Sequence, residues 1–202
     1  MAESMKGLSR TCRCAELSEQ NIGQTVTVMG WVQKQRNKGS IVFVDLRDRS
    51  GVIQLIYEED VCGAENFAKA ARMRAEFVVA AVGVVRRRDG AVNTNLATGA
   101  IEVHVRETRI LSESETPPFH IEEGINTREE LRLKYRSLDL RRPDMQRRII
   151  LRSKIIQYMR EFMSAEGFLE IETPILCKST PEGARDYLVP SHVHPGNFYA
   201  LP

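Results

Sequence analysis

Three cationic side chains, an aromatic ring and a side-chain amide fall within a short part of the sequence. Lys34, Arg36 and Lys38 lie in a segment that we expect to form a loop, and Phe43 and Gln54 follow on segments with strand character. Cations hold phosphates, a ring stacks on a base, and an amide hydrogen-bonds to a base edge. This combination favours the binding of single-stranded nucleic acid. The alternative is that Phe43 packs beneath a loop and that Gln54 is an ordinary exposed residue.

The alternation of apolar residues places Phe43 and Gln54 on one surface. Successive side chains of a strand point to opposite faces, so the apolar set of the first segment faces the core and leaves Phe43, Asp45 and Arg47 outward. The same alternation in the second segment leaves Gln54 on the face of Phe43. The side chains that we expect in the core are Val42, Val44, Leu46, Ile53, Leu55 and Tyr57.

Five segments with strand character and one helical segment occupy the first 110 residues. We expect strands at 25–33, 41–48, 52–57, 77–85 and 101–107, and an amphipathic helix at 61–74. A helix between the third and fourth of five strands is the order of an OB-fold barrel, which binds oligonucleotides through its second and third strands and its first loop. SH3-like barrels also have five strands, but the position of the helix favours the OB fold.

The pattern of short strands ends at a polar segment. Residues 112–124 are rich in Ser and Glu and include Pro117 and Pro118, which is typical of a linker. Further on, Pro143 begins a helical pattern and Gly167 ends it, which predicts one long helix of about 22 residues. A short strand is expected next, at 168–172. The sequence therefore predicts an α+β chain with at least two parts.

Charge and hydropathy limit the class of protein. The net charge is only +2, but eleven of the residues from Arg128 to Arg160 are Lys or Arg. They could attract phosphates, or they could form a solvated helix face. The sequence holds no run of 18 apolar residues and no continuous apolar segment of a signal peptide, so we expect a cytoplasmic protein without a membrane partner.

Cysteine usage does not predict a metal site. The four cysteines are Cys12, Cys14, Cys62 and Cys177, and only the first two are close in sequence. Because no second pair has the spacing of zinc ligands, we expect no metal and we expect reduced thiols.

Longer stretches of the sequence resemble a known family. Residues 30–32, 41–51 and 97–103 resemble the anticodon-binding domain of aspartyl-tRNA synthetases, and residues 131–143 look like the hinge that follows it. Residues 167–174 are similar to motif 1 of class II synthetases, which lysyl- and asparaginyl-tRNA synthetases share. The most restrictive resemblance is Pro-Glu-Gly-Ala-Arg-Asp-Tyr-Leu-Val-Pro at 181–190, which is similar to the bacterial or organellar aspartyl branch.

This resemblance divides the chain into three parts. It implies an OB-fold anticodon-binding domain at 1–111, a linker and hinge at 112–143, and the first part of a class II catalytic domain at 144–202. Motif 1 is a dimer element in the family, so the resemblance also implies a homodimer formed through the long helix and Pro174. The alternative is that these elements form an intramolecular core of helix and sheet.

The resemblance implies binding roles for individual residues. Arg36, Phe43, Gln54 and Glu102 match the positions at which the family contacts the tRNA anticodon. Glu182 matches a carboxylate on a mobile loop that meets the ammonium group of the substrate aspartate. Without the residues around it in the sequence, Glu182 would be interpreted as an ordinary exposed loop carboxylate. The implied partner is tRNA(Asp), and the loop that contains Lys38 leaves open whether tRNA(Asn) is charged as well.

The family enzyme is an aspartate–tRNA ligase. With ATP and Mg²⁺ it joins aspartate to the nucleotide as aspartyl-adenylate, and it then transfers the aspartyl group to the terminal ribose of tRNA. Motifs 2 and 3, which supply the ATP-binding arginines, have no counterpart in a sequence that stops at Pro202. We therefore expect the chain to bind an anticodon, to hold no catalytic residue and to bind neither ATP nor Mg²⁺ tightly.

Two alternatives to this interpretation stay open at the level of sequence. One is a stand-alone OB-fold paralogue that binds nucleic acid and has no ligase role. The other is a ligase specific for asparagine or lysine, and the segment 181–190 argues against it.

A first prediction concerns catalysis by the purified 202-residue chain. Because motifs 2 and 3 have no counterpart, the chain should not exchange pyrophosphate with ATP in the presence of aspartate. Labelled pyrophosphate measures this exchange, and a full-length enzyme of the family serves as the positive control. Exchange above background would contradict the expectation.

Overall fold

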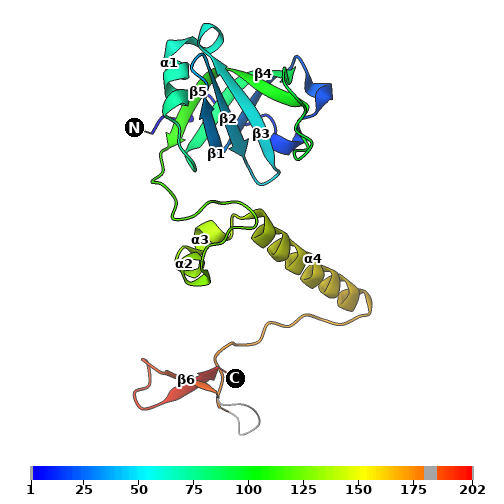
Figure 1. Cartoon of the computed structure of the whole chain (residues 1–202). Coiled ribbons are helices and arrows are strands. Elements are labelled where there is room, and N and C mark those ends of the chain that lie inside the picture. The colour runs from blue at the N-terminus through cyan, green and yellow to red at the C-terminus, as the bar shows by residue number, and fades with distance from the viewer. Residues whose placement is uncertain (1, 180–185, 202) are drawn as a thin grey trace. The chain divides into compact units, whose positions relative to one another are not determined.

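The computed structural model describes residues 2–179 and 186–201, and the chain is drawn in Figure 1. It divides into two compact units, Met1–Met145 and Gln146–Pro202. The division falls inside the long helix, whereas the sequence suggested boundaries after residues 111 and 143. Those two boundaries stay predictions.

The first unit contains a closed five-stranded barrel. Its strands are β1 (Thr25–Asn37), β2 (Ile41–Arg47), β3 (Val52–Glu58), β4 (Val78–Arg87) and β5 (Ile101–Ser112), in the order β1-β2-β3-β5-β4. Helix α1 (Glu59–Arg72) connects β3 to β4. Strands β3 and β5 pair in parallel, and the other neighbours pair antiparallel. The predicted OB fold, with its helix between the third and fourth strands, is confirmed.

The predicted alternation of β2 and β3 is also confirmed. All six side chains expected in the core of the barrel are completely buried, namely Val42, Val44, Leu46, Ile53, Leu55 and Tyr57. They pack with Val28 and Val32 of β1 and with Val103 and Val105 of β5 in one apolar cluster. Phe43 and Gln54 therefore lie on the outer face of the barrel, as the alternation predicts.

Strand β1 is longer than the sequence suggested. Lys34 and Arg36 lie in this strand and not in a loop, and only Lys38 belongs to the turn before β2. The strand continues because a β-bulge between Val32 and Lys34 shifts the register, so that β1 pairs with β2 as far as Asn37. Pairing satisfies the backbone N–H and C=O groups that a loop would leave to water, which favours the longer strand.

A set of arginine–carboxylate pairs fixes the end of the barrel next to the hinge. Arg47 of β2 points outward as predicted, but it is buried. It donates to Glu76 Oε1 at 2.6 Å. Arg141 donates to the other oxygen of Glu76 at 3.0 Å, and its guanidinium lies 5.2 Å from the centroid of the Trp31 ring. Glu76 adopts a positive φ of 66°, a conformation that a non-glycine residue keeps only when its surroundings hold it.

The basic hinge folds into short helices around a buried carboxylate. Helices α2 (Glu129–Lys134) and α3 (Arg136–Asp139) precede the long helix α4 (Pro143–Ala165). Burial alone would raise the pKa of Asp139, but the hydrogen bond from Arg142 and the nearby charges of Arg132 and Arg136 outweigh it and lower the pKa. These arginines are thus paired with a carboxylate of the same chain. The sequence had suggested phosphate binding or a solvated helix face for the basic stretch, and neither interpretation included this internal pairing.

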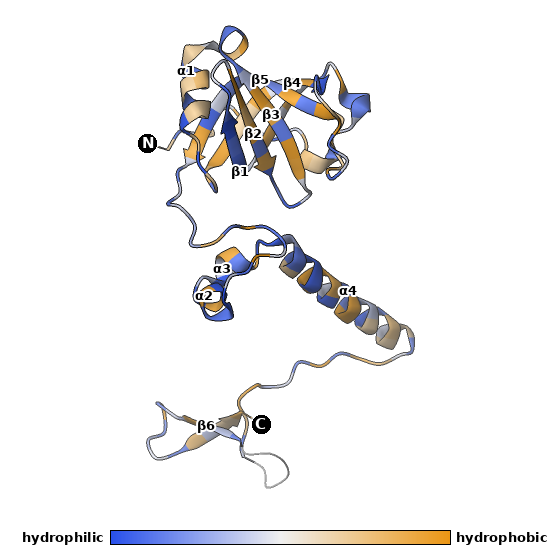
Figure 2. Cartoon of the chain, in the orientation of Figure 1, coloured by the Kyte–Doolittle hydropathy of each residue, from blue (hydrophilic) through white to orange (hydrophobic). Residues whose placement is uncertain are grey.

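Helix α4 matches the predicted long helix. It has 23 residues, and it closes with Gly167 at a φ of 86° and with a hydrogen bond from the Phe168 amide to the Met163 carbonyl. None of its residues is buried, and Figure 2 shows hydrophobic residues interspersed with hydrophilic ones along it. Neither α4 nor another helix in the described part of the chain is long and apolar enough to cross a membrane.

The strand predicted at 168–172 is wrong. These residues form no strand, because a strand requires a neighbour to bond its N–H and C=O groups and no described segment pairs with them. The second unit instead contains a two-stranded antiparallel ribbon of β6 (Tyr187–Pro190) and β7 (Phe198–Leu201). The sequence did not predict this ribbon.

A second prediction concerns Gly30, where β1 comes close to β2. A Cβ atom at this position would lie 2.3 Å from the carbonyl oxygen of Arg47, so one of two paired backbones would have to move. Gly30→Ala should therefore lower the free energy of unfolding by about 1–3 kcal/mol, as overpacking does. Urea denaturation measures the change.

The matched control is Gly90→Ala, because no heavy atom lies within 4 Å of a Cβ built there. Its effect should stay within about 0.5 kcal/mol. Equal effects of the two substitutions would show that the approach of β1 to β2 is not tight.

Candidate nucleic-acid interface

An open pocket of about 260 Å³ lies on the outer face of the barrel. Strands β1, β2 and β3 contribute to it, together with the loop between β4 and β5. Its lining residues are Arg36, Lys38, Phe43, Asp45, Gln54, Arg88 and Asn93. Three of the four residues matched to the anticodon site, Arg36, Phe43 and Gln54, are thus brought together.

Arg36 and Phe43 form the open side of this pocket. The Arg36 guanidinium carbon lies 5.9 Å from the centroid of the Phe43 ring, and the ring is half-buried. Arg36 also pairs with Asp45 at 2.8 Å. Burial raises the pKa of Asp45 above its ordinary value, and the charge and hydrogen bond of Arg36 oppose that shift. Phe43 therefore keeps an accessible ring next to a positioned cation, an arrangement that suits stacking of a base.

Gln54 is held on three sides and is buried, so it is not the freely exposed residue of the alternative interpretation. Its Oε1 accepts hydrogen bonds from Arg36 at 3.1 Å and from Arg88 at 2.8 Å, and its Nε2 donates to Glu102 at 2.8 Å. The opposite orientation would place the amide nitrogen against two guanidinium groups and the oxygen against a carboxylate. The contacts therefore fix the orientation of the amide and leave one N–H without a partner among the residues that the structure describes.

Glu102 lies behind Gln54. The residue is 1% exposed, and its Oε2 accepts from Gln54 and lies 3.8 Å from the Nε of Arg88. Its Oε1 lies 3.3 Å from Nε2 of His104. Direct contact of Glu102 with an anticodon stays a prediction from resemblance. The geometry shows a carboxylate that acts on Gln54 and Arg88.

Two residues of this pocket were missed by the sequence reasoning. Arg88 and Asn93 belong to the segment between β4 and β5, and the strand pattern was followed only to Val85. The run Arg86-Arg87-Arg88 before a Gly-containing turn was a usable signal. Glu182, the residue matched to the aspartate substrate, lies outside the described residues.

The pocket can donate hydrogen bonds more readily than it can accept them. Gln54 has used both acceptor positions of its oxygen, and the carboxylates of Asp45 and Glu102 are paired with side chains of the site. Donors that remain include an N–H of Gln54, guanidinium N–H groups of Arg36 and Arg88, and the ammonium of Lys38. Phosphate oxygens and the acceptor atoms of a base edge are the partners that these groups can bind.

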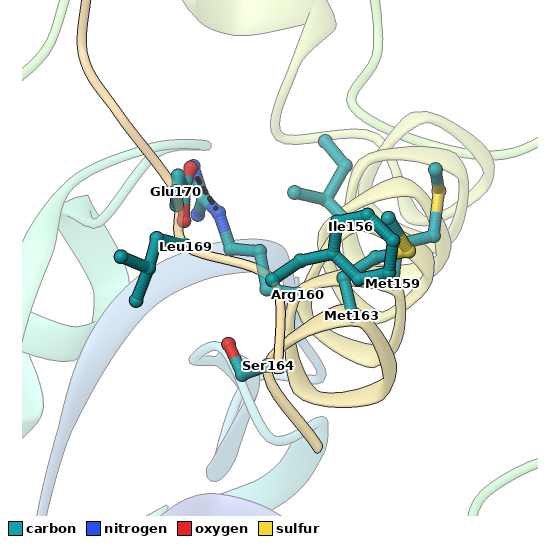
Figure 3. A pocket seen from close by; sticks show the side chains of 8 residues that line it. Ile156, Met159, Arg160, Met163, Ser164, Leu169 and Glu170 are labelled. Atoms are coloured by element: carbon teal, nitrogen blue, oxygen red, sulfur yellow. Dashed lines mark hydrogen bonds and ion pairs between the residues drawn. The ribbon is translucent and has the colours of Figure 1, made fainter. Parts of the chain in front are cut away.

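A second hollow lies in the other unit, along the C-terminal half of α4 (Figure 3). It is mainly apolar, and the residues that line it include Ile156, Met159, Met163, Phe168 and Leu169. Figure 3 shows Arg160 and Glu170 next to each other at its edge, where they form an ion pair of 2.9 Å. This composition suits contact with another apolar protein surface and not with a polyanion.

Two family models match different parts of the chain. Residues 26–111 match the model described as OB-fold nucleic acid binding domain. Residues 128–202 match the model described as tRNA synthetases class II (D, K and N).

The curated relatives are tRNA ligases. The chain is 71% identical over its full length to an aspartate–tRNA(Asp/Asn) ligase of Lachnoclostridium phytofermentans and 64% identical to an aspartate–tRNA ligase of Agathobacter rectalis. It spans 34% of the length of each of these relatives. Among solved structures, asparaginyl-tRNA synthetase from Pyrococcus horikoshii complexed with asparaginyl-adenylate is similar, with a TM-score of 0.81 and 26% identity. That match covers 96% of this chain and 42% of the solved one.

A third prediction tests the buried part of the pocket. Glu102→Ala removes the acceptor of Gln54 and the counter-charge of Arg88, so buried donors are left without a partner. The free energy of unfolding should fall by about 3–5 kcal/mol, as when one member of a buried pair is removed. Chemical denaturation of the purified chain measures the loss.

Glu107→Ala, on the same strand, provides the control. Glu107 is half exposed and pairs with Arg109 at the surface, so its loss should cost at most about 1 kcal/mol. If both substitutions cost the same, the carboxylate of Glu102 does not organise the pocket.

Proposed function

Because the chain belongs to the aspartyl-tRNA synthetase family, we propose that its barrel binds the anticodon loop of tRNA(Asp) as part of an aspartate–tRNA ligase. The observation that carries this proposal is the pocket in which Phe43, Gln54 and two guanidinium groups converge on the outer face of β1, β2 and β3. The similarity to this family supports the choice of tRNA, and the convergence of these side chains in one pocket supports the choice of residues. The chain spans about a third of the relatives' length, so the activity of the whole enzyme belongs to the proposal as well.

In this proposal each side chain of the pocket has a distinct role. Phe43 stacks on an anticodon base, because its ring is accessible and flanked by a cation. Gln54 donates its free N–H to an acceptor atom of a base edge. Arg36, Lys38 and Arg88 hold phosphate oxygens or base acceptors. Glu102 keeps the amide of Gln54 in the orientation that makes this possible.

Whether tRNA(Asn) is bound in addition to tRNA(Asp) is left to experiment. One of the two relatives carries the description tRNA(Asp/Asn) and the other does not. The proposal commits to tRNA(Asp), which both descriptions share, and binding of tRNA(Asn) is a further outcome to measure.

The chemistry of aspartate activation is proposed for the full-length enzyme. ATP and Mg²⁺ would serve it there, in the cytoplasm, and the group transferred is an aspartyl residue. Glu182 stays the one substrate contact assigned to this chain, on resemblance alone.

We also propose that the full-length enzyme is a homodimer through the segment of α4. Large apolar side chains are exposed along this helix and directly after it, including Ile149, Met159, Phe162 and Leu169. Such a surface is expected to be covered in the assembled protein. A second copy of the same segment is the occupant that the resemblance to motif 1 favours.

A fourth prediction tests the stacking role of Phe43. Phe43→Ala should weaken binding of the tRNA(Asp) anticodon stem-loop by about 1–3 kcal/mol, the contribution of one stacked base. Phe43→Tyr should retain most of the affinity, because it keeps a ring of similar size. Fluorescence anisotropy of a labelled stem-loop, at one fixed salt concentration, measures the difference.

Ile22→Ala is the control for loss of an exposed apolar side chain elsewhere in this unit. A stem-loop with a scrambled anticodon is the control for charge alone. Unchanged affinity of Phe43→Ala would remove Phe43 from the interface. Equal affinity for the two stem-loops would contradict anticodon recognition altogether.

A further inference from the structure

A buried histidine lies beside the pocket, and no role has been assigned to it above. His104 follows Glu102 by two residues on β5, so both side chains face outward while Val103 and Val105 face the core. Its backbone lies opposite Val84 of β4 and Ile56 of β3. Although it faces outward, His104 is 4% exposed. A buried polar ring at this place needs partners.

The imidazole of His104 lies between two carboxylates. Its Nε2 is 3.3 Å from Oε1 of Glu102, and its Nδ1 is 3.6 Å from Oε2 of Glu58. Nδ1 is buried and has no hydrogen-bond partner within the part of the chain that the structure describes. The contact of Nε2 with Glu102 is the closer of the two, and because an ionised carboxylate only accepts hydrogen bonds, a hydrogen bond there places a proton on Nε2. His104 therefore donates to Glu102 and is only loosely tied to Glu58.

This contact divides the two oxygens of Glu102 between different partners. Oε1 faces His104, while Oε2 accepts from Gln54 and faces the Nε of Arg88. The last torsion of a glutamate side chain is broad, so the carboxylate plane is set by its hydrogen bonds and not by a rotamer well. Without the donor at Nε2, the carboxylate could turn to place both oxygens toward Arg88, which favours bidentate pairing. Such a turn would move Oε2 from the position in which it accepts the hydrogen bond of Gln54.

We propose that His104 is a positioning residue for base recognition: it orients the Glu102 carboxylate, and through it the Gln54 amide. The inference rests on the proposed function, because it assumes that Gln54 contacts a base. A correctly held amide presents one N–H, whereas a released amide can turn and present its oxygen. His104 therefore acts on the discrimination between bases more than on the attraction of the polyanion.

The test uses two amide substitutions that place a donor at different ends of the former ring. The side-chain nitrogen of Gln can take the place of Nε2, and that of Asn the place of Nδ1. His104→Gln should therefore keep the donor to Glu102, whereas His104→Asn keeps only the contact to Glu58, and His104→Leu removes both. Each variant is made in the full 202-residue chain, and its folding is checked by its thermal unfolding midpoint.

The measured quantity is the ratio of affinities for the tRNA(Asp) anticodon stem-loop and for stem-loops with one anticodon base replaced. His104→Gln should retain most of the discrimination of the unmodified chain. His104→Asn and His104→Leu should lose about tenfold in discrimination, the order of one hydrogen bond, with little change in affinity for the replaced loops. A purely structural role would lower all affinities together and would not separate Gln from Asn.

The outcomes distinguish this inference from the function on which it rests. If the unmodified chain does not discriminate between the stem-loops, the proposed function fails. If it discriminates and the Asn variant discriminates as well as the Gln variant, the role of His104 is overturned while the function stands. If the Leu variant does not fold, the comparison of Gln with Asn decides.

Discussion

The hydrogen bond between Gln54 and Glu102 is the interaction on which the pocket on the outer face of the barrel depends. A carboxylate that is almost completely buried is strongly destabilising unless its oxygens are hydrogen-bonded or paired. Here Gln54, His104 and Arg88 surround it, at 2.8, 3.3 and 3.8 Å. The same contacts hold the amide of Gln54 against the two guanidinium groups of Arg36 and Arg88. The same set of contacts therefore satisfies the buried carboxylate and fixes the orientation of the Gln54 amide.

Strand β2 connects this surface to the opposite end of the barrel. Phe43 lies in the pocket, and Arg47, four residues further on and on the same face, reaches Glu76 and so the hinge residue Arg141. Both ends use arginine–carboxylate pairs, and in each of them the carboxylate is more buried than the arginine. Strand β2 thus contributes to the pocket at one end and to the contacts with the hinge at the other.

Alternation in the sequence was sufficient to place Phe43 and Gln54 on one face, because a two-residue period depends only on local backbone geometry. It could not show that Gln54 is buried, since that depends on Arg88 and on a loop about 35 residues further along the chain. Lys34 and Arg36 were assigned to a loop because a β-bulge leaves no clear mark in the alternation. The prediction of a strand at 168–172 was wrong for a different reason. Alternation of apolar residues indicates that a segment could form a strand, but a strand also needs a neighbouring strand with which to pair. The roles of Glu102 and Glu182 came from resemblance and not from pattern, whereas the cation Arg36 was suggested by both.

We propose that Gln54 and Glu102 recognise nucleic acid as a coupled pair. A double-mutant cycle with Gln54→Ala and Glu102→Ala, measured on affinity for the tRNA(Asp) anticodon stem-loop at a temperature where all four proteins are folded, tests it most directly. We expect a coupling energy of about 0.5–3 kcal/mol, the range for residues in contact. Effects that add within about 0.3–0.5 kcal/mol would show that the two residues act independently and would contradict it.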